Sequence, residues 1–176
     1  MRVFRTIWLL HRWLGIAAGV ILMMVSITGF LLLIKKDNAW IQPPTQRGTP
    51  GPLSACLGMA ELWPVIEAVG HPDFQKVEDI DRIDVRLEKR VYKVRSKHNH
   101  TEIQVDATTG KILSTDTRRS DFIERLHDGS FFGGGVHGYL MPAFAVSLVY
   151  LVFSGIWLWL EPVVKRRRRR KRDAAK

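Results

Sequence analysis

Two long apolar segments set the pattern of hydrophobic and polar positions in this chain. The first covers residues 7–34 and holds 22 consecutive uncharged residues from 13 to 34. A helix of that length spans roughly 33 Å, enough to cross the hydrocarbon core of a bilayer. The segment has no polar face, exceeds the length of a signal-peptide core and is followed by no small-residue cleavage site. It therefore predicts a transmembrane helix, ended by Lys35 and Lys36.

The second apolar segment covers residues 138–160 and is also free of charge. Pro142 falls in its first turn, where a missing N–H costs little. Tyr139, Trp157 and Trp159 lie near its ends, where amphipathic rings prefer the headgroup zone. Two spans predict that both chain termini lie on one side of a membrane.

The segment between the spans changes from helical to strand periodicity. A Pro/Gly linker over 37–58 precedes apolar residues at helical spacing over 57–69, where Pro64 either opens a short helix or kinks a longer one. From residue 76 onward, apolar and polar positions alternate in four short runs, with a glycine turn at 106–110. We expect an α+β domain over 59–116, and an amphipathic helix with an apolar re-entry over 117–137.

Charge orients this arrangement. The net charge is +10, and residues 1–34 and 161–176 hold 12 Lys/Arg against 2 Asp/Glu, whereas 35–136 is neutral. The positive-inside rule predicts a cytoplasmic head and first helix over 1–36, a second helix over 138–160, a basic cytoplasmic tail over 161–176, and an extracytoplasmic segment over 37–137. The basic run 165–172 favours a topology anchor on anionic lipid headgroups over a nucleic-acid site. A single cysteine, Cys56, excludes an internal disulfide.

One face of the first helix carries small residues beside a histidine. His11 is followed at helical spacing by Gly15, Gly19, Ser26 and Gly29, a pattern that favours close helix packing or a flat cofactor. The alternative is an interfacial histidine on a lipid-facing helix.

Candidate chemistry elsewhere is sparse. The sequence shows no phosphate loop, dinucleotide fingerprint or nucleophile elbow, and we predict no catalytic residue. His98 and His100 flank a turn, but two ligands without a third predict no metal site.

Several phrases resemble a known family. The run Glu102-Ile-Gln-Val-Asp106-Ala-Thr-Thr-Gly110-Lys111 resembles the end of a PepSY domain. His11-Arg12-Trp13-Leu14-Gly15, Leu126-His127 and Ser154-Gly155-Ile-Trp157-Leu-Trp159 resemble the PepSY-associated transmembrane family. The resemblance implies a membrane α+β fold, with two transmembrane helices flanking a small outward-facing PepSY-like domain. Larger members are similar to two such units fused, and some are ferric-siderophore reductases that hold b-type haem between helices.

The resemblance implies haem b as a candidate cofactor, with His11, His127 and His137 as candidate axial ligands. The alternatives are that His127 caps the end of the short helix and that His137 is an interfacial residue. A bilayer separates His11 from the other two, so a second chain would have to complete each haem site in a homodimer or larger complex. Three functions compete: a non-catalytic accessory subunit of a respiratory or metal-handling complex, which we favour; a haem-dependent electron-transfer or ferric-reductase-like protein; and a peptidase-inhibitor or sensor module. The architecture indicates a bacterial inner membrane.

Overall fold

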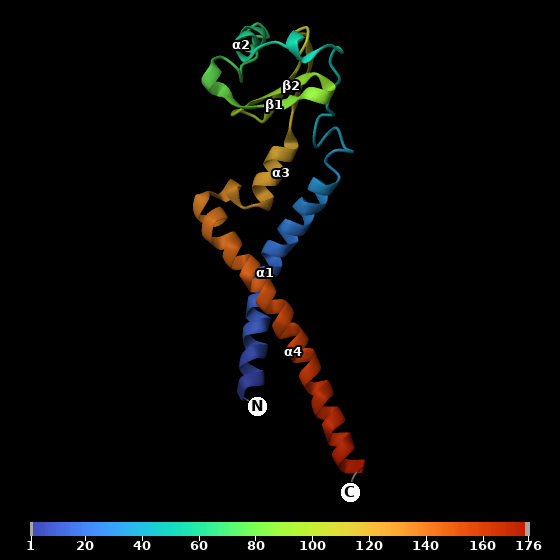
Figure 1. The fold of residues 1–176 in the computed structure, drawn as a ribbon. Helices are drawn as coiled ribbons and strands as arrows, with labels where there is room; N and C mark the ends of the chain where they lie inside the picture. The colour runs from blue at the N-terminus through green and yellow to red at the C-terminus, as the bar shows by residue number, and fades with distance from the viewer. Residues whose placement is uncertain (1, 175–176) are drawn as a thin grey trace. The chain divides into compact units, whose positions relative to one another are not determined.

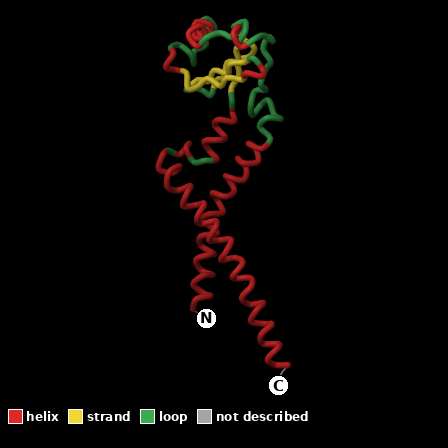
Figure 2. Tube along the Cα trace, in the orientation of Figure 1, coloured by secondary structure: helices red, strands yellow, loops and turns green. Residues whose placement is uncertain are grey.

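The computed structural model describes residues 2–174, which form two compact units. The helix-pair unit comprises residues 2–29 and 125–174, and the sheet unit comprises residues 30–124. In chain order the main elements are α1 (Arg2–Leu33), α2 (Met59–Glu67), β1 (Ile80–Arg86), β2 (Val91–Ser96), β3 (Thr101–Asp106), β4 (Ile112–Thr117), α3 (Arg119–His127) and α4 (Met141–Ala174), with single turns of 3₁₀ and π helix between some of them (Figures 1 and 2). The predicted α+β fold with two membrane-capable helices is confirmed.

In the helix-pair unit, α1 and α4 cross with their chains running in opposite directions (Figure 1). His11 contacts Ser154, and one turn further along α1 Gly15 faces Leu151, so the contacts run in opposite order along the two helices. Residues 2 and 174 therefore lie at the same end of the pair (Figure 1). Only Ala18 and Thr28 of α1 and Phe144 and Ser154 of α4 are buried, and the remaining side chains leave a largely apolar surface uncovered. Such a surface suits contact with lipid or with further helices.

Two element boundaries differ from those that the sequence predicts. Strand β4 continues through Thr117, because Asp116 and Thr117 pair with Glu102 and Thr101 of β3, and α3 begins only at Arg119. Helix α4 continues through the basic run 165–172 to Ala174. Arginine and lysine are good helix formers, so a helix leaving the apolar span has no local reason to stop there.

The sheet unit is built on an antiparallel sheet in the order β1-β2-β3-β4. Tyr92 and Val94 of β2 lie opposite Val105 and Ile103 of β3, and this face packs against α2. The core shared by that face, α2 and the loop after it is fully buried, and it consists of Leu62, Ile66, Phe74, Tyr92, Val94, Ile103, Val105 and Ala107. Pro64 lies inside α2 without ending it.

The Pro/Gly linker covers the other face of the sheet. The side chain of Gln104 accepts from the Gln46 amide and donates to the Pro44 carbonyl, and Asp106 accepts from the amide and hydroxyl of Thr49. A Cβ at Gly48 would lie 2.1 Å from the Arg90 carbonyl oxygen, so only glycine fits there. The linker is thus a bound layer of the sheet unit, which explains why both faces of β2 and β3 are buried.

Candidate functional site

The first candidate site joins α1 to the middle of α4. His11 Nδ1 lies 2.8 Å from the Ser154 hydroxyl, and Ser154 is 6% exposed. The next residue is Gly155, where an added Cβ would lie 3.2 Å from His11 Cε1. The imidazole therefore rests against α4 where the helix has no side chain, and the hydroxyl beside that position fixes its orientation.

The second candidate site repeats this arrangement between α3 and α1. His127, the last residue of α3, places Nδ1 3.0 Å from the hydroxyl of Thr28 on α1, and Thr28 is also 6% exposed. A Cβ at Gly29 would lie 3.2 Å from His127 Cε1. Each histidine thus meets a hydroxyl–glycine pair, Ser154-Gly155 or Thr28-Gly29, on a neighbouring helix.

The hydroxyl contacts favour one tautomer of each ring. Thr28 Oγ1 lies 2.8 Å from the Met24 carbonyl oxygen, and a hydroxyl that donates its one hydrogen there can only accept from His127. Ser154 Oγ has a carbonyl acceptor of its own, Leu151, at 3.2 Å. With the hydroxyls donating to these carbonyls, both histidines donate from Nδ1, and a neutral imidazole then carries a lone pair on Nε2. Within residues 2–174 neither Nε2 has a hydrogen-bond partner.

His137 follows the same rule with a different acceptor. It lies in the π-helical turn Val136–Leu140, and its Nδ1 is 2.9 Å from the Asp128 carbonyl oxygen. A carbonyl only accepts, so Nδ1 is again the donor. Asp128 follows His127 directly, so His127 and His137 lie at one end of the helix-pair unit. His11 and Thr28 are 17 residues apart on α1, which puts His11 roughly 26 Å from that end.

The small residues of α1 divide into two groups. A Cβ at Gly15 would meet Leu151 at 3.8 Å, and Gly29 faces His127 as described. By contrast, a Cβ at Gly19 would meet nothing within 4 Å among the described residues, and Ser26 is exposed. The structure therefore brings Gly15 and Gly29 against side chains of the unit and leaves Gly19 and Ser26 on its open surface.

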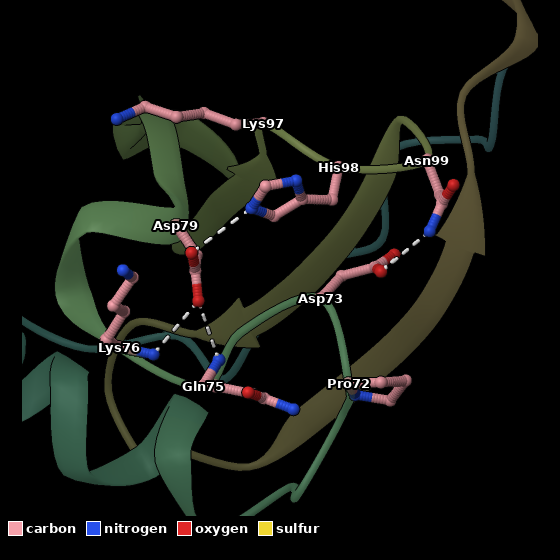
Figure 3. A pocket seen from close by; sticks show the side chains of 8 residues that line it. All are labelled: Pro72, Asp73, Gln75, Lys76, Asp79, Lys97, His98 and Asn99. Atoms are coloured by element: carbon pink, nitrogen blue, oxygen red, sulfur yellow. Dashed lines mark hydrogen bonds and ion pairs between the residues drawn. The ribbon is translucent and has the colours of Figure 1, made fainter.

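A pocket in the sheet unit gathers two carboxylates and a histidine, but their oxygens are already engaged (Figure 3). Asp79 accepts from the Gln75 and Lys76 amides and from His98 Nε2, and Asp73 accepts from Asn99 and Thr101. Burial would raise the pKa of each aspartate, but these hydrogen bonds outweigh it and hold the pKa of both below the usual range. Residues 2–174 contain no group of three or more metal-ligating side chains. The pocket is best explained as a structural turn.

Comparison with known proteins gives the family. A model described as PepSY-associated TM region matches residues 8–176. The chain belongs to the PepSY-associated transmembrane family. No curated protein matches it. Because the match includes both helices of the pair and the whole sheet unit, the resemblance of the sequence to this family is confirmed, and the chain is a membrane protein of the PepSY-associated type.

Sequence reasoning missed the two hydroxyls that orient the histidines. His11 and Ser154 are 143 positions apart, and Thr28 and His127 are 99 apart, so no local pattern links them. One signal was available: each apolar span contains a single hydroxyl–glycine dipeptide, Thr28-Gly29 or Ser154-Gly155. In a membrane helix such a pair offers a hydrogen-bond partner and close approach at one point.

Proposed function

We propose that this chain is the haem-binding subunit of a larger membrane assembly, in which the helix-pair histidines provide axial ligands to b-type haem. The observation that supports it is the shared geometry of His11 and His127: Nδ1 is held by a buried hydroxyl, and Nε2 has no partner among residues 2–174. Metal-bound histidines typically donate their second ring nitrogen to such an outer partner, which fixes the tautomer and the ring plane.

The residues fit a haem ligand in chemistry and in space. Haem iron binds the lone pair of a neutral imidazole, and the Nδ1–H tautomer presents that lone pair on Nε2. Gly29 and Gly155 let the rings lie against a helix backbone. Bound haem would supply one-electron transfer. The chain's own contribution is to orient the rings and to exclude water with its apolar helices.

A second chain is required to complete each site. His11 lies roughly 26 Å along α1 from the end of the unit that holds His127 and His137, so one chain cannot offer ligands from both places to one iron. The uncovered apolar faces of α1 and α4 leave room for a second helix pair. A two-fold homodimer would bring each histidine opposite its own copy, giving one site at each end.

The optical spectrum of the full chain in mild detergent tests this proposal. We expect a b-type α-band in the dithionite-reduced minus oxidised spectrum, weakened or lost in His11→Ala and His127→Ala and retained in the control His98→Ala of the sheet unit. His137→Ala shows whether His137 or His127 is the ligand at the shared end. A folded protein without this band would overturn the proposal and leave the non-catalytic accessory subunit, which the uncovered helix faces also suit.

For the orientation, we propose that both termini are cytoplasmic and that the sheet unit faces outward across a bacterial inner membrane. The basic run 165–172 supports this through the positive-inside rule. In a Cys56→Ser background, a membrane-impermeant maleimide added to spheroplasts should label Lys111→Cys and should not label Arg169→Cys. The opposite labelling would invert the topology.

The peptidase-inhibitor or sensor alternative rests on family analogy alone.

A further inference from the structure

The sheet unit contains a cleft that differs chemically from the histidine sites. Its volume is about 900 Å³, and it lies between the linker residues Pro43–Thr45 and the end of β1 with the turn that follows. Lys93 and Arg95 of β2 and Arg118 form the deep part of its wall. All lining residues belong to the sheet unit.

The lining is strongly cationic. Of its 16 residues, eight are lysine or arginine and two are glutamate: Lys35, Lys36, Arg82, Arg86, Lys89, Lys93, Arg95 and Arg118, with Glu88 and Glu124. This bias is local, because residues 35–136 as a whole are neutral. A concave wall of one charge sign concentrates counter-ions of the opposite sign.

The deep cations are paired with carboxylates. Glu102 is fully buried and lies 2.9 Å from Lys93 Nζ and 3.0 Å from Arg118 Nη1, while Arg95 Nη2 reaches Asp84. Burial lowers the pKa of Lys93, and the nearby guanidinium groups add to this, although Glu102 opposes it. Arg95 Nε is buried 3.6 Å from Glu102 Oε2 and has no hydrogen bond to any of residues 2–174. One donor at the floor thus remains unused.

The rim cations are not balanced in the same way. Lys35 pairs with Glu124 at 2.6 Å and Arg82 with Asp81 at 3.5 Å. Lys36 and Arg86 are exposed, and no described residue pairs with either. An unpaired guanidinium offers a planar fork of donors that matches a phosphate or carboxylate.

An apolar side chain stands beside these cations. Leu87 is 56% exposed and lines the cleft directly after Arg86. Val85 points to the other face of the sheet, because it lies opposite Tyr92 of the core. Lys35 and Lys36 come two and three residues after the last residue of α1. The cleft therefore combines free cations, an exposed apolar side chain and the residues with which the chain leaves its first span.

We propose that this cleft binds the phosphate of an amphiphilic anion, with Lys36 and Arg86 contacting the oxyanion and Leu87 the adjoining apolar part. Two sources share this chemistry: an anionic phospholipid of the surrounding bilayer, and a soluble alkyl phosphate. The site is separate from the proposed haem ligands, so either proposal can fail without the other.

The test compares two double variants of the full chain in nanodiscs. Lys36→Gln/Arg86→Gln removes the two free cations of the cleft, and the control Lys76→Gln/Lys111→Gln removes the same charge from exposed positions outside it. The basic run 165–172 is unchanged in both, so its attraction for anions cancels. In phosphatidylcholine discs, hexyl phosphate binding is measured by calorimetry. In equimolar phosphatidylglycerol and phosphatidylcholine discs, retained phosphatidylglycerol is counted by native mass spectrometry.

We expect the cleft variant to lose roughly tenfold or more in affinity for hexyl phosphate, or to lose its retained phosphatidylglycerol, because it lacks the charged hydrogen-bond donors. The control should resemble the wild type. The arm that responds identifies the source. Absence of binding in both arms for the wild type, or equal losses in the two double variants, would overturn the proposal.

Discussion

The histidines of the two units engage their neighbours through different ring nitrogens. In the helix-pair unit, Nδ1 of His11 and of His127 lies against a hydroxyl, and Nδ1 of His137 donates to the Asp128 carbonyl. In the sheet unit, His98 donates from Nε2 to Asp79, and His71 accepts the Asp73 amide at Nδ1. With Nδ1 as the donor, a neutral imidazole of the first set carries its lone pair on Nε2, whereas in the second set Nε2 carries the proton.

This difference indicates what the polar side chains of each unit do. The sheet unit uses its histidines, carboxylates and buried cations to hold turns, the linker and the second sheet face. The helix-pair unit buries few polar side chains, and those few orient rings whose second nitrogen has no partner among the described residues. We therefore expect substitutions in the sheet unit to cost stability, and substitutions around the histidines of the helix pair to cost ligand binding.

The largest effect is expected at Glu102. Glu102→Gln leaves Lys93, Arg95 and Arg118 without their shared buried carboxylate, and removing one partner from such a group costs about 3–5 kcal/mol. Amide hydrogen exchange of β2 and β3 in the full chain measures the free energy of unfolding of the sheet unit. The exposed control Glu88→Gln should stay within about 0.5 kcal/mol. Equal exchange in the two variants would contradict this role for Glu102.

The next effect is expected at Asp106, which accepts hydrogen bonds from Thr49, Thr108 and Thr109. Burial would raise its pKa, but these bonds hold the pKa of Asp106 well below the usual range. The stabilisation is therefore complete above the unfolded pKa of about 4 and is lost as pH falls through the lower folded value. Asp106→Asn should cost about 1–3 kcal/mol at neutral pH.

This dependence is measured by melting temperatures between about pH 2 and about pH 7. That interval brackets the ordinary carboxyl pKa of about 4. The melting temperature of the wild type should fall only at the acid end of this interval. The melting temperature of Asp106→Asn should be lower at neutral pH and should fall less steeply as the pH is lowered. Thr109→Ala, which keeps its own backbone N–H, serves as a mild control. Parallel curves for the wild type and Asp106→Asn would show that Asp106 does not contribute through its charge.

How far the sequence predicts this structure depends on the range of the interactions involved. Apolar runs and period-two alternation identify both spans and all four strands, because those elements bury continuous faces. The bound linker could not be predicted, since Thr49 meets Asp106 from 57 positions away and Gly48 is needed only because Arg90 lies against it. Likewise, the positions of His11 and His127 in the sequence marked them as candidates. Their hydroxyl partners could be identified only from the packed helices.

Within the helix pair, removing a hydroxyl should separate stability from binding. Thr28→Val and Ser154→Ala should each change stability by only about 0.6 kcal/mol, the typical worth of a hydrogen bond between membrane helices. Loss of an outer-shell partner of a metal ligand typically lowers affinity by about 10–100-fold. Haem titration followed by the Soret band measures this, and Thr28→Ser should bind like the wild type. Unchanged affinity in both hydroxyl-free variants would contradict the orienting role.

The smallest effect is expected at the glycines that face the rings. Gly29→Ala and Gly155→Ala each place a Cβ 3.2 Å from an imidazole carbon, so the ring must shift by a few tenths of an ångström. We expect a small shift in the position or width of the haem bands. Gly19→Ala is the matched control, because its Cβ would meet nothing within 4 Å. A band change as large in Gly19→Ala would show that the shift reports general helix packing.

The most direct test of the account is the tautomer of each histidine. Nitrogen-15 NMR of the haem-free full chain, at a pH where the imidazoles are neutral, distinguishes a protonated ring nitrogen from one with a lone pair, and single histidine substitutions assign the signals. We predict a protonated Nδ1 and a lone pair on Nε2 for His11, His127 and His137, and a protonated Nε2 for His71 and His98. Protonated Nε2 at His11 and His127 would contradict it, because neither ring could then offer that nitrogen to iron.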